Sequence, residues 1–518
     1  MQNSLSLPSY STALDEPQSF IERWSTSFVF VLMSIPVLGA FFFIGQSLRL
    51  DESQSLWQVS RSLSGILTLV AGDVHVPLYH VLLHYWRMAF GESVTIARLF
   101  SLFFFVLSVP ALYLLGSRAY NKRTGLLVAF LFAISPFMNW YASEIRMYTL
   151  FVFLTIMSQY FFIRIMQEER PRLATWASYT LIAILGVFTH YFFFLSLIAQ
   201  AVYFFLRHRI FPKYTLRLFI GSGIVVALAI APWVWYVLFR GVVGFQEPSL
   251  VAPSFVDLFS TFSQFLFGFQ SDALNTIFLS LWPIAVILGL VALRRSVRFL
   301  PQTEYFIVSI LLSFGLTFFG SHLFAPIFVS RYLIFTIPAF YLIVASLFST
   351  YTKGFRRVIQ GALVTLMLVT FGIQVTSPNT PVKEEYRGAT EYLSMHATAQ
   401  DAIIVSAPFT IYPVQYYYRG PSPIKTLPEW DQYAYGPIPT FNHAALPDMV
   451  AKTTADYQNV YLVLSYNQGY EADIKQYFDS HYERLNARTF SNDLSVYVYR
   501  LRYNTVLSAI PTAVTRTN

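Results

Sequence analysis

The stretch from Val94 to Ser117 reads VTIARLFSLFFFVLSVPALYLLGS and contains one charged residue, Arg98. A helix of this length can cross the apolar core of a bilayer, which is about 30 Å thick and requires about 20 residues. Similar apolar runs recur along the 518-residue chain, which is 55% hydrophobic and only 12% charged. Soluble proteins carry about 25% charged residues. The sequence therefore predicts a polytopic α-helical membrane protein.

Ten further apolar runs bring the predicted number of spans to eleven. They cover residues 26–45, 124–141, 147–165, 174–190, 191–206, 217–238, 273–293, 303–322, 331–350 and 357–375. The stretch Pro77–Phe90 is also apolar, but its 14 residues are too few to cross the bilayer as a helix. We expect this stretch to lie at the interface or to re-enter the membrane.

Basic loops between the spans predict the orientation of the chain. If Pro77–Phe90 does not span, five basic loops fall on one side: Arg118/Lys122/Arg123, Arg164/Arg170/Arg172, Arg207/Arg209/Lys213, Arg294/Arg295/Arg298 and Lys353/Arg356/Arg357. Positive loops remain in the cytoplasm, which places the tail 1–25 inside and the region after the last span outside. The same loops account for the net charge of +8, so no nucleic-acid partner is expected.

The ends of the chain and its composition narrow the alternatives. The first span is preceded by a polar stretch without the basic start of a secretory signal, so we interpret it as an uncleaved anchor. The chain contains no cysteine, which excludes disulfides, thiol nucleophiles and metal sites with Cys ligands. The predicted domains are a tail at 1–25, a transmembrane domain at 26–375 and an external domain at 376–518.

Two kinds of segment are predicted outside the spans. Leu56–Val70 and Phe255–Phe269 are expected to form helices on the membrane surface, the first because its apolar residues recur at helical spacing. The polar, Tyr-rich region after residue 376 predicts a soluble α/β domain. Its expected strands are Ala402–Ser406, Val460–Ser465 and Leu494–Leu501, and its expected helices are Glu384–His396, Ile411–Tyr418 and Glu471–Tyr482.

Ionisable side chains collect at the predicted external ends of the spans. Charges inside a membrane are costly, so their positions indicate function. This external layer comprises Asp51, Glu52, Asp73, His75, Arg98, Glu144, Arg146, His190, His322 and Arg331. Carboxylates at the same depth as Arg and His indicate a site that handles an anion beside a carboxylate.

Each member of the external layer also has a structural interpretation. The pair Asp51-Glu52 could be the acidic start of a helix, where the helix dipole favours carboxylates. Asp73 could cap the helix that follows it. Glu144 and Arg146 could form a local ion pair, and the remaining basic and imidazole groups could be buried or interfacial anchors.

A sugar carried on a polyprenyl phosphate fits the chemistry of the external layer. Arg and His would bind its phosphate, since the planar guanidinium matches phosphate oxygens in a bidentate manner. A hydroxyl acceptor needs a carboxylate base within hydrogen-bond reach. Because phosphate is already a good leaving group, one carboxylate suffices where glycosidases use two.

Several short motifs resemble those of GT-C glycosyltransferases of the family 39 type. This group includes protein O-mannosyltransferases and the aminoarabinose transferase of lipid A. The motifs are DE at 51–52, GDVHVPLYH at 72–80, GE at 91–92 followed by RL at 98–99, SPFMNWYASEIRMY at 135–148, THY at 189–191 and SRYL at 330–333. The resemblance covers about Ser47–Thr350 and is closest to the bacterial branch.

This resemblance implies an external active site, a polyprenyl-phosphate sugar donor and inversion at the anomeric carbon. It implies that Asp51 is the catalytic base and that Glu52 supports or orients it. The side chains that would bind the donor phosphate are His75, Arg146, His190 and Arg331. The side chains that would support the substrate are Asp73, His80, Glu144, Tyr148, Tyr191 and Tyr332.

The resemblance leaves cofactors and some details open. Some relatives bind a divalent metal ion between these loops, and Asp51 and Glu144 would be its ligands here; the sequence itself assigns no cofactor. The usual His-Pro-Pro of the family reads His75-Val76-Pro77 in this chain, which puts the detailed role of that turn in doubt.

Two other functions remain as alternatives. A secondary transporter would place charges near the bilayer midplane on broken helices and often shows an internal repeat. A non-catalytic membrane subunit of a polysaccharide or glycolipid export system would need no base. Charges at the external ends and a soluble domain after the last span favour the enzyme. We expect it in the plasma or inner membrane, with membrane lipids around it, while the sugar and its hydroxyl acceptor on protein, glycan or lipid stay open.

Overall fold

The computed structural model describes residues 23–73, 75–207, 212–240, 251–295, 300–377, 384–433 and 439–501. Most of the predicted N-terminal tail, Arg209 and Arg298 of the basic loops, and residues 241–250 between two predicted spans lie outside these ranges. The chain divides into two units. The transmembrane unit contains Met1–Gln46 and Ser55–Pro381, and the C-terminal unit contains Ser47–Gln54 and Val382–Asn518. The division falls inside helix α4.

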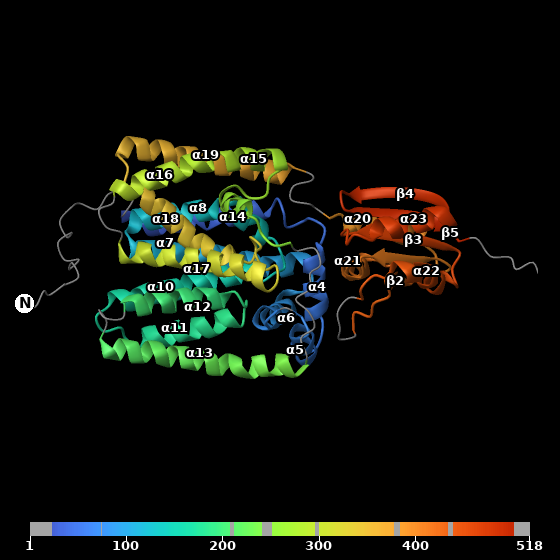
Figure 1. Ribbon diagram of the computed structural model, residues 1–518, viewed down its shortest axis with the longest axis horizontal. Helices are drawn as coiled ribbons and strands as arrows, with labels where there is room; N and C mark the ends of the chain where they lie inside the picture. Colours follow the sequence, from blue (N-terminus) through green and yellow to red (C-terminus); the bar gives the residue numbers. More distant parts are fainter. Residues whose placement is uncertain are drawn as a thin grey trace, which may run out of the picture. The chain divides into compact units, whose positions relative to one another are not determined.

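The transmembrane unit is built from helices, most of which lie side by side (Figure 1). Its longer helices are α7 (Val94–Ala119), α8 (Lys122–Ala133), α10 (Tyr148–Gln167), α11 (Leu173–Val187), α12 (Phe193–Arg207), α13 (Lys213–Arg240), α16 (Trp282–Arg295), α17 (Pro301–Leu323), α18 (Ile337–Ser349) and α19 (Lys353–Thr376). Its shorter helices are α2 (Ser25–Leu32), α3 (Ser34–Ala40), α5 (Leu63–Ala71), α6 (Leu78–Phe90), α9 (Pro136–Ala142), α14 (Phe255–Phe267), α15 (Asp272–Ser280) and the 3-10 helix η2 (Ile334–Thr336). Helix α4 (Leu50–Val59) connects the two units.

The chain has the helices of a membrane protein, as the sequence predicts. Within the described residues, six helices are long and apolar enough to cross a bilayer, or seven if α8 and α9, bent by 61°, form one span. Every one of the eleven predicted spans coincides with a helix or a pair of successive helices. Several of these helices are shorter than 18 residues, so the number of spans stays a prediction.

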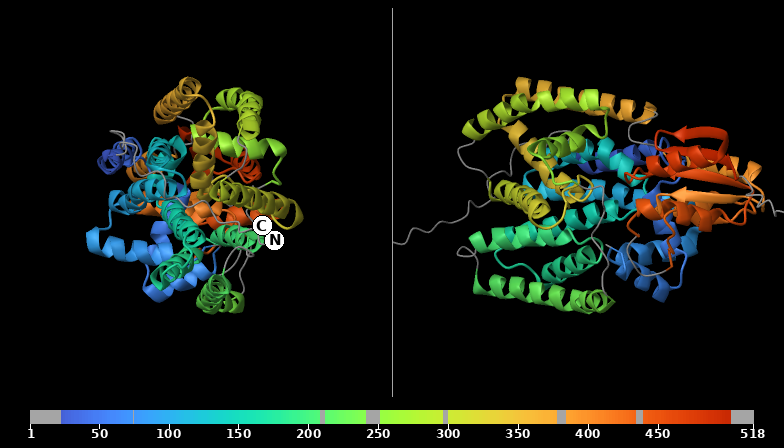
Figure 2. Two further views of the ribbon diagram at one scale, coloured as in Figure 1. Left: turned by 90° about the vertical axis from the view of Figure 1, so that its left-hand side faces the viewer. Right: turned by 45° about the vertical axis from the view of Figure 1, so that its right-hand side comes forward.

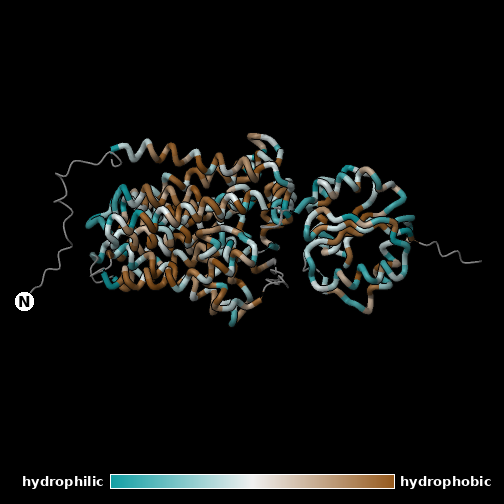
Figure 3. The backbone as a smooth tube through the Cα atoms, turned by 90° about the horizontal axis from the view of Figure 1, so that it is seen from above, coloured by the Kyte–Doolittle hydropathy of each residue, from teal (hydrophilic) through white to brown (hydrophobic). Residues whose placement is uncertain are grey.

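The hydrophobic surface of the transmembrane unit agrees with a lipid environment. Large apolar side chains face outward, with Phe41 74% and Leu228 68% exposed. Hydrophobic residues dominate the helices of this unit, and hydrophilic residues are more frequent toward the ends of these helices and in the C-terminal unit (Figure 3). A soluble protein would rarely expose so much contiguous apolar surface.

Polar side chains link helices in the interior of the bundle. Tyr179 of α11 donates a hydrogen bond to Oε1 of Gln200 in α12 at 2.7 Å. The amide nitrogen of Gln200 donates to Ser158 Oγ of α10 at 2.9 Å. In hydrocarbon such bonds between helices have few competitors, so Gln200 fixes how α10, α11 and α12 pack. The packing of the helices seen end-on is shown in Figure 2.

Glycines allow α7 and α8 to approach closely, and this gives a first testable prediction. A Cβ added at Gly125 would lie 2.6 Å from the carbonyl oxygen of Tyr113 and 2.8 Å from the amide nitrogen of Ser117. Backbone atoms cannot move aside as a side chain could, so overpacking costs about 1–3 kcal/mol. Gly125→Ala should therefore lower the melting temperature of the purified protein. Gly221→Ala is the control, because nothing lies within 4 Å of its added Cβ; equal melting temperatures in both variants would contradict the packing argument.

The surface segments follow the prediction in part. Helix α14 coincides with the helix expected at Phe255–Phe269, and α6 covers most of Pro77–Phe90. The position of both helices at the membrane surface stays a prediction. The expected single helix at Leu56–Val70 is instead two helices, α4 and α5, separated at Ser60–Ser62. The break arises because Ser62 begins a new helix: its side chain accepts a hydrogen bond from the amide of Gly65.

The C-terminal unit contains a five-stranded mixed sheet. The strands are β1 (Ala402–Ser406), β2 (Ile424–Thr426), β3 (Asn459–Ser465), β4 (Glu483–Ser491) and β5 (Leu494–Arg500). Their order is β2-β1-β3-β5-β4, with β1 parallel to β2 and β3, and β5 antiparallel to β3 and β4. The helices are α20 (Tyr386–His396), α21 (Ile411–Tyr417), α22 (Leu446–Thr454), α23 (Glu471–His481) and the 3-10 helices η3 (Pro408–Thr410) and η4 (His443–Ala445).

A hydrophobic core holds this unit together. Ile404 and Leu462 of the sheet pack with Val450 of α22 and Phe478 of α23. The predicted strands correspond to β1, β3 and β5, and the predicted helices to α20, α21 and α23. Strands β2 and β4 and helix α22 were not predicted from the sequence. Strand β4 is exposed along most of its length and therefore lacks the alternating apolar pattern of a strand with one buried face.

Candidate active site

The acidic pair lies in the first turn of α4 and not in an open loop. Glu52 is 0% exposed, and its Oε2 accepts a hydrogen bond from the amide of Arg49 at 3.0 Å. The Arg49 Nε lies 3.7 Å from the same oxygen. A Glu at the third helical position that reaches back to the residue before the helix stabilises the helix start, so Glu52 has a structural task. Asp51 is partly exposed and can meet a substrate.

The second half of α4 belongs to the transmembrane unit and carries two polar side chains. Ser55 Oγ accepts a hydrogen bond from Arg146 Nη1 at 3.2 Å. Gln58 donates to Asp73 Oδ2 at 2.9 Å. Asp73 therefore has a polar partner on α4. Neither Ser55 nor Gln58 was assigned to the site from the sequence.

Arg146 is the central cation of the site in the transmembrane unit. It precedes α10, is only 5% exposed, and its Nη2 lies 2.7 Å from His75 Nε2. Because a guanidinium can only donate, His75 Nε2 accepts, which places the imidazole proton on Nδ1. The structure thus brings together Arg146 and His75, which were both predicted from the sequence to bind the donor phosphate.

A second histidine lies beside this pair. The rings of His75 and His80 are stacked, with centroids 5.8 Å apart. Burial lowers the pKa of His80 to about 3, and the neighbouring His75 and Arg146 act in the same direction. His80 is therefore neutral at physiological pH and acts as a packing partner of His75.

The turn between α11 and α12 joins the same region. The hydroxyl of Tyr191 donates to the carbonyl oxygen of His75 at 3.4 Å. The His190 ring stacks on Phe151 of α10 at 4.6 Å between centroids. The amide of Leu78, at the start of α6, donates to the carbonyl oxygen of Phe188 at 3.0 Å, so the start of α6 is fixed to the end of α11.

The turn before η2 contributes Arg331 and Tyr332. The Tyr332 ring lies 5.8 Å from the His190 ring, between centroids. The Arg331 guanidinium lies over the Tyr332 ring at 5.4 Å from its centroid. His190, Tyr332 and Arg331 are therefore neighbours, although 140 residues of sequence separate the two turns.

Three other buried side chains have different surroundings. Tyr148 is 1% exposed and packs edge-on against Tyr141 at 4.9 Å. Glu144 is buried after the end of α9. Arg98 is 1% exposed and donates from Nη1 to the carbonyl oxygens of Ile44 and Gln46, at 2.9 and 2.7 Å. Arg98 therefore holds the end of the first apolar segment.

Helix direction separates this site from the basic loops. Arg146 and His75 lie before the starts of α10 and α6, and His190 follows the end of α11, whereas Arg164 and Arg172 lie at the opposite ends of α10 and α11. The polar site and the basic loops are thus at opposite ends of these helices. This is the arrangement that the orientation rule needs.

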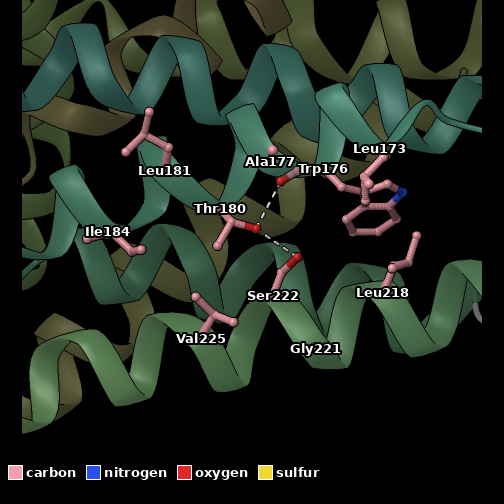
Figure 4. Close-up of a pocket in the computed structure, with 10 residues that line it drawn as sticks. All are labelled: Leu173, Trp176, Ala177, Thr180, Leu181, Ile184, Leu218, Gly221, Ser222 and Val225. Carbon is pink, nitrogen blue, oxygen red and sulfur yellow. Dashed lines mark hydrogen bonds between the residues drawn. The ribbon is translucent and has the colours of Figure 1, made fainter.

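The groove between α11 and α13 is unsuited to sugar chemistry. It is lined by apolar side chains such as Leu181, Ile184 and Val225 (Figure 4). Its hydroxyls, Thr180 and Ser222, are hydrogen-bonded to each other at 2.9 Å. The groove has no carboxylate or imidazole in its lining.

The proposed metal ligands receive no support from geometry. Across the described ranges, no group of three or more His, Cys, Asp or Glu side chains is arranged to hold a metal ion. A site with two protein ligands is not tested by this observation, so metal binding by Asp51 and Glu144 stays a prediction, and the reaction proposed for this chain uses no metal.

Known proteins resemble this chain in sequence and in fold. Residues 74–236 match the sequence model of a family described as dolichyl-phosphate-mannose-protein mannosyltransferase. A search of the curated proteins finds no match. Among solved structures, ArnT from Cupriavidus metallidurans superposes with a TM-score of 0.58 at 12% identity, over 92% of this chain and 98% of ArnT. The chain has the GT-C fold.

The same ArnT has a solved structure bound to undecaprenyl phosphate, with the same TM-score, identity and coverage. The family match includes the motifs at 135–148 and 189–191 and most of the motif at 72–80. The resemblance to GT-C glycosyltransferases that the motifs indicate is therefore confirmed.

Proposed function

We propose that this chain is a glycosyltransferase that transfers a sugar from a polyprenyl phosphate to a hydroxyl acceptor at the external face of the membrane. The observation that carries the proposal is Arg146, buried and bound to His75 and Ser55 at the helix ends opposite the basic loops. The GT-C fold and the match to a mannosyltransferase family support it. ArnT, which shares this fold, binds undecaprenyl phosphate.

The basic side chains would act on the donor phosphate. A buried guanidinium attracts an anion more strongly than an exposed one, because the surrounding dielectric is lower. Its planar donors match phosphate oxygens. His75 keeps the Arg146 side chain in place by accepting from Nη2. As the bond to the sugar breaks, negative charge grows on the phosphate, and Arg146 would stabilise that charge. His190 and Arg331 would complete this side of the site.

Asp51 would act as the base. In the reaction, the acceptor oxygen attacks the anomeric carbon and forms the new glycosidic bond while Asp51 takes the hydroxyl proton. The bond between the anomeric carbon and the phosphate oxygen breaks, and polyprenyl phosphate leaves with the electron pair. A single displacement of this kind inverts the anomeric carbon. Asp51 lies four residues before Ser55 on α4, one turn along the helix.

The membrane orientation belongs to the same proposal. We infer eleven spans, a cytoplasmic N-terminal tail at 1–25, a transmembrane domain at 26–375 and an extracytoplasmic domain at 376–518. The basic loops support this sidedness. The location would be the plasma or inner membrane, where polyprenyl-phosphate sugars are displayed to external acceptors.

An assay with purified protein in liposomes tests the proposed function. Several polyprenyl-phosphate sugars would be supplied with peptide, glycan and lipid acceptors, and free polyprenyl phosphate would be measured. We expect at least one sugar to release polyprenyl phosphate and to appear on an acceptor. Movement of an intact donor across the bilayer without release would favour the transporter, and neither release nor movement with any donor would favour the non-catalytic subunit.

A further inference from the structure

The segment that carries Asp51 is part of the C-terminal unit. Ser47 Oγ accepts a hydrogen bond from the amide of Arg387 at 3.1 Å. The amide of Leu48, a residue with 0% exposure, donates to the hydroxyl of Tyr417 at 3.0 Å. These contacts join the residues just before α4 to the helices α20 and α21, more than 300 residues later in the chain.

Glu384 contacts the residue that precedes Asp51. Its Oε2 accepts a hydrogen bond from the amide of Leu50, the first residue of α4, at 3.0 Å. The first amides of a helix have no partner within the helix and attract carboxylates. Glu384 therefore caps α4 from a distant part of the sequence, while Glu52 satisfies the preceding amide of Arg49. Asp51 lies in the helix turn that these two carboxylates fix.

Glu384 is itself held in place. It is only 7% exposed, and its Oε1 accepts a hydrogen bond from the hydroxyl of Tyr466. Tyr466 has a φ of 58° and is the one described residue other than glycine with a positive φ. A bulky residue in this region is a true outlier. Such strain persists where surrounding contacts enforce it, and it gathers at functional sites. The ring of Phe409 packs edge-on against Tyr466 at 5.8 Å.

We propose that Glu384, held by Tyr466, is a positioning residue that fixes the first turn of α4 and thereby the direction of the Asp51 carboxylate. This inference rests on the proposed function, because it assigns a role in the transfer step to the C-terminal unit. The C-terminal unit would then orient the proposed base, Asp51, whether or not it also selects the acceptor.

The stability that Glu384 contributes depends on pH, because its carboxyl changes its charge. Burial raises the pKa of Glu384 to about 7, although Tyr466, the Leu50 amide and Arg49 favour its ionised form; the nearby Asp51 adds to the increase. Tyr386 also interacts electrostatically with this carboxyl. Because the folded protein binds this proton more tightly than the unfolded chain, the stability from this group is fully present below the ordinary value of 4.5 and is lost as pH rises through about 7.

Three variants and one control test the positioning role. Glu384→Ala removes both hydrogen bonds, Glu384→Gln keeps the shape and the acceptor for Leu50, and Tyr466→Phe removes only the bond to Glu384. Glu429→Gln is the control, because it removes a carboxylate of the same unit that is 70% exposed and pairs with Lys452. All would be purified as full chains.

Hydrogen exchange of residues 47–54 reports on the anchor without requiring activity. We expect Glu384→Ala to speed the exchange of these amides by at least about tenfold, and Glu429→Gln to leave it unchanged. Unchanged exchange in Glu384→Ala would overturn the inference even if the protein proved not to be a transferase. A failed transferase assay with wild-type protein would instead count against the proposed function.

Turnover reports on positioning. Misplacement of a reacting group by about 1 Å can cost about 10²-fold in rate. We expect Glu384→Ala to lower kcat by about ten- to a hundredfold with the KM for the donor within about twofold, since Arg146 and its partners are untouched. Tyr466→Phe should lower kcat less. Glu384→Gln should recover part of the rate. Because Gln does not titrate, the melting temperature of this variant should not show the decrease that we expect for the wild type as the pH rises through about 7. Wild-type kcat in Glu384→Ala, or a loss confined to KM, would overturn the positioning role.

Discussion

Asp51→Asn is expected to lower the rate of sugar transfer by about 10²–10⁴-fold, the usual contribution of a general base. Asn has nearly the same shape as Asp but cannot take up the proton of the acceptor hydroxyl. Asp51 is partly exposed, so its replacement should leave the melting temperature almost unchanged. The release of polyprenyl phosphate by the purified variant measures the effect.

Glu52→Gln is the matched control for this prediction. It alters the neighbouring carboxylate, which is 0% exposed and engaged with the amide of Arg49. We expect Glu52→Gln to lose about 0.5–2 kcal/mol of stability, as other changes at helix starts do, and to keep most of its turnover. Full activity in Asp51→Asn together with loss of activity in a folded Glu52→Gln would transfer the role of base to Glu52.

Arg146→Lys is expected to weaken the binding of polyprenyl phosphate by about ten- to a hundredfold, or about 1.4–2.8 kcal/mol. Lysine keeps the positive charge, but it is a point charge without the planar set of donors. It cannot keep the contacts to Ser55 and His75 and also bind two phosphate oxygens. Titration of the purified protein with undecaprenyl phosphate, followed by native mass spectrometry, measures the change.

Arg98→Lys controls for the loss of a buried guanidinium at the same end of the bundle. Arg98 donates to the carbonyl oxygens of Ile44 and Gln46, so its replacement should lower stability and leave lipid binding unchanged. If both variants weakened lipid binding equally, the phosphate would not be recognised by Arg146 in particular.

The fold could be predicted from the sequence where one property dominates. Long apolar runs such as Val94–Ser117 require helices in any bilayer protein, and the short Pro77–Phe90 cannot cross. The basic loops lie at one end of α10 and α11, where helix direction requires them. Arg146 and His75 could be predicted to lie in the same external layer, because the predicted order of spans puts both residues at the same ends of the helices.

Other features depend on contacts between distant residues and leave no local pattern. Glu384 lies 334 residues from Leu50, and it accepts a hydrogen bond from the Leu50 amide. The sequence around Glu384 is that of an ordinary helix start. The positive φ of Tyr466 is not indicated by its residue type. Glu52 could not be separated from Asp51 by sequence alone, because the difference is that α4 begins at Leu50 and turns Glu52 inward.

A structure of the protein with bound undecaprenyl phosphate tests the central claim most directly. We expect phosphate density within hydrogen-bond distance of the Arg146 guanidinium, at the ends of α6, α10 and α11 that lie next to His75, Arg146 and His190. Phosphate density at the opposite helix ends, beside the basic loops with Arg164 and Arg172, would contradict both the site and the orientation of the chain.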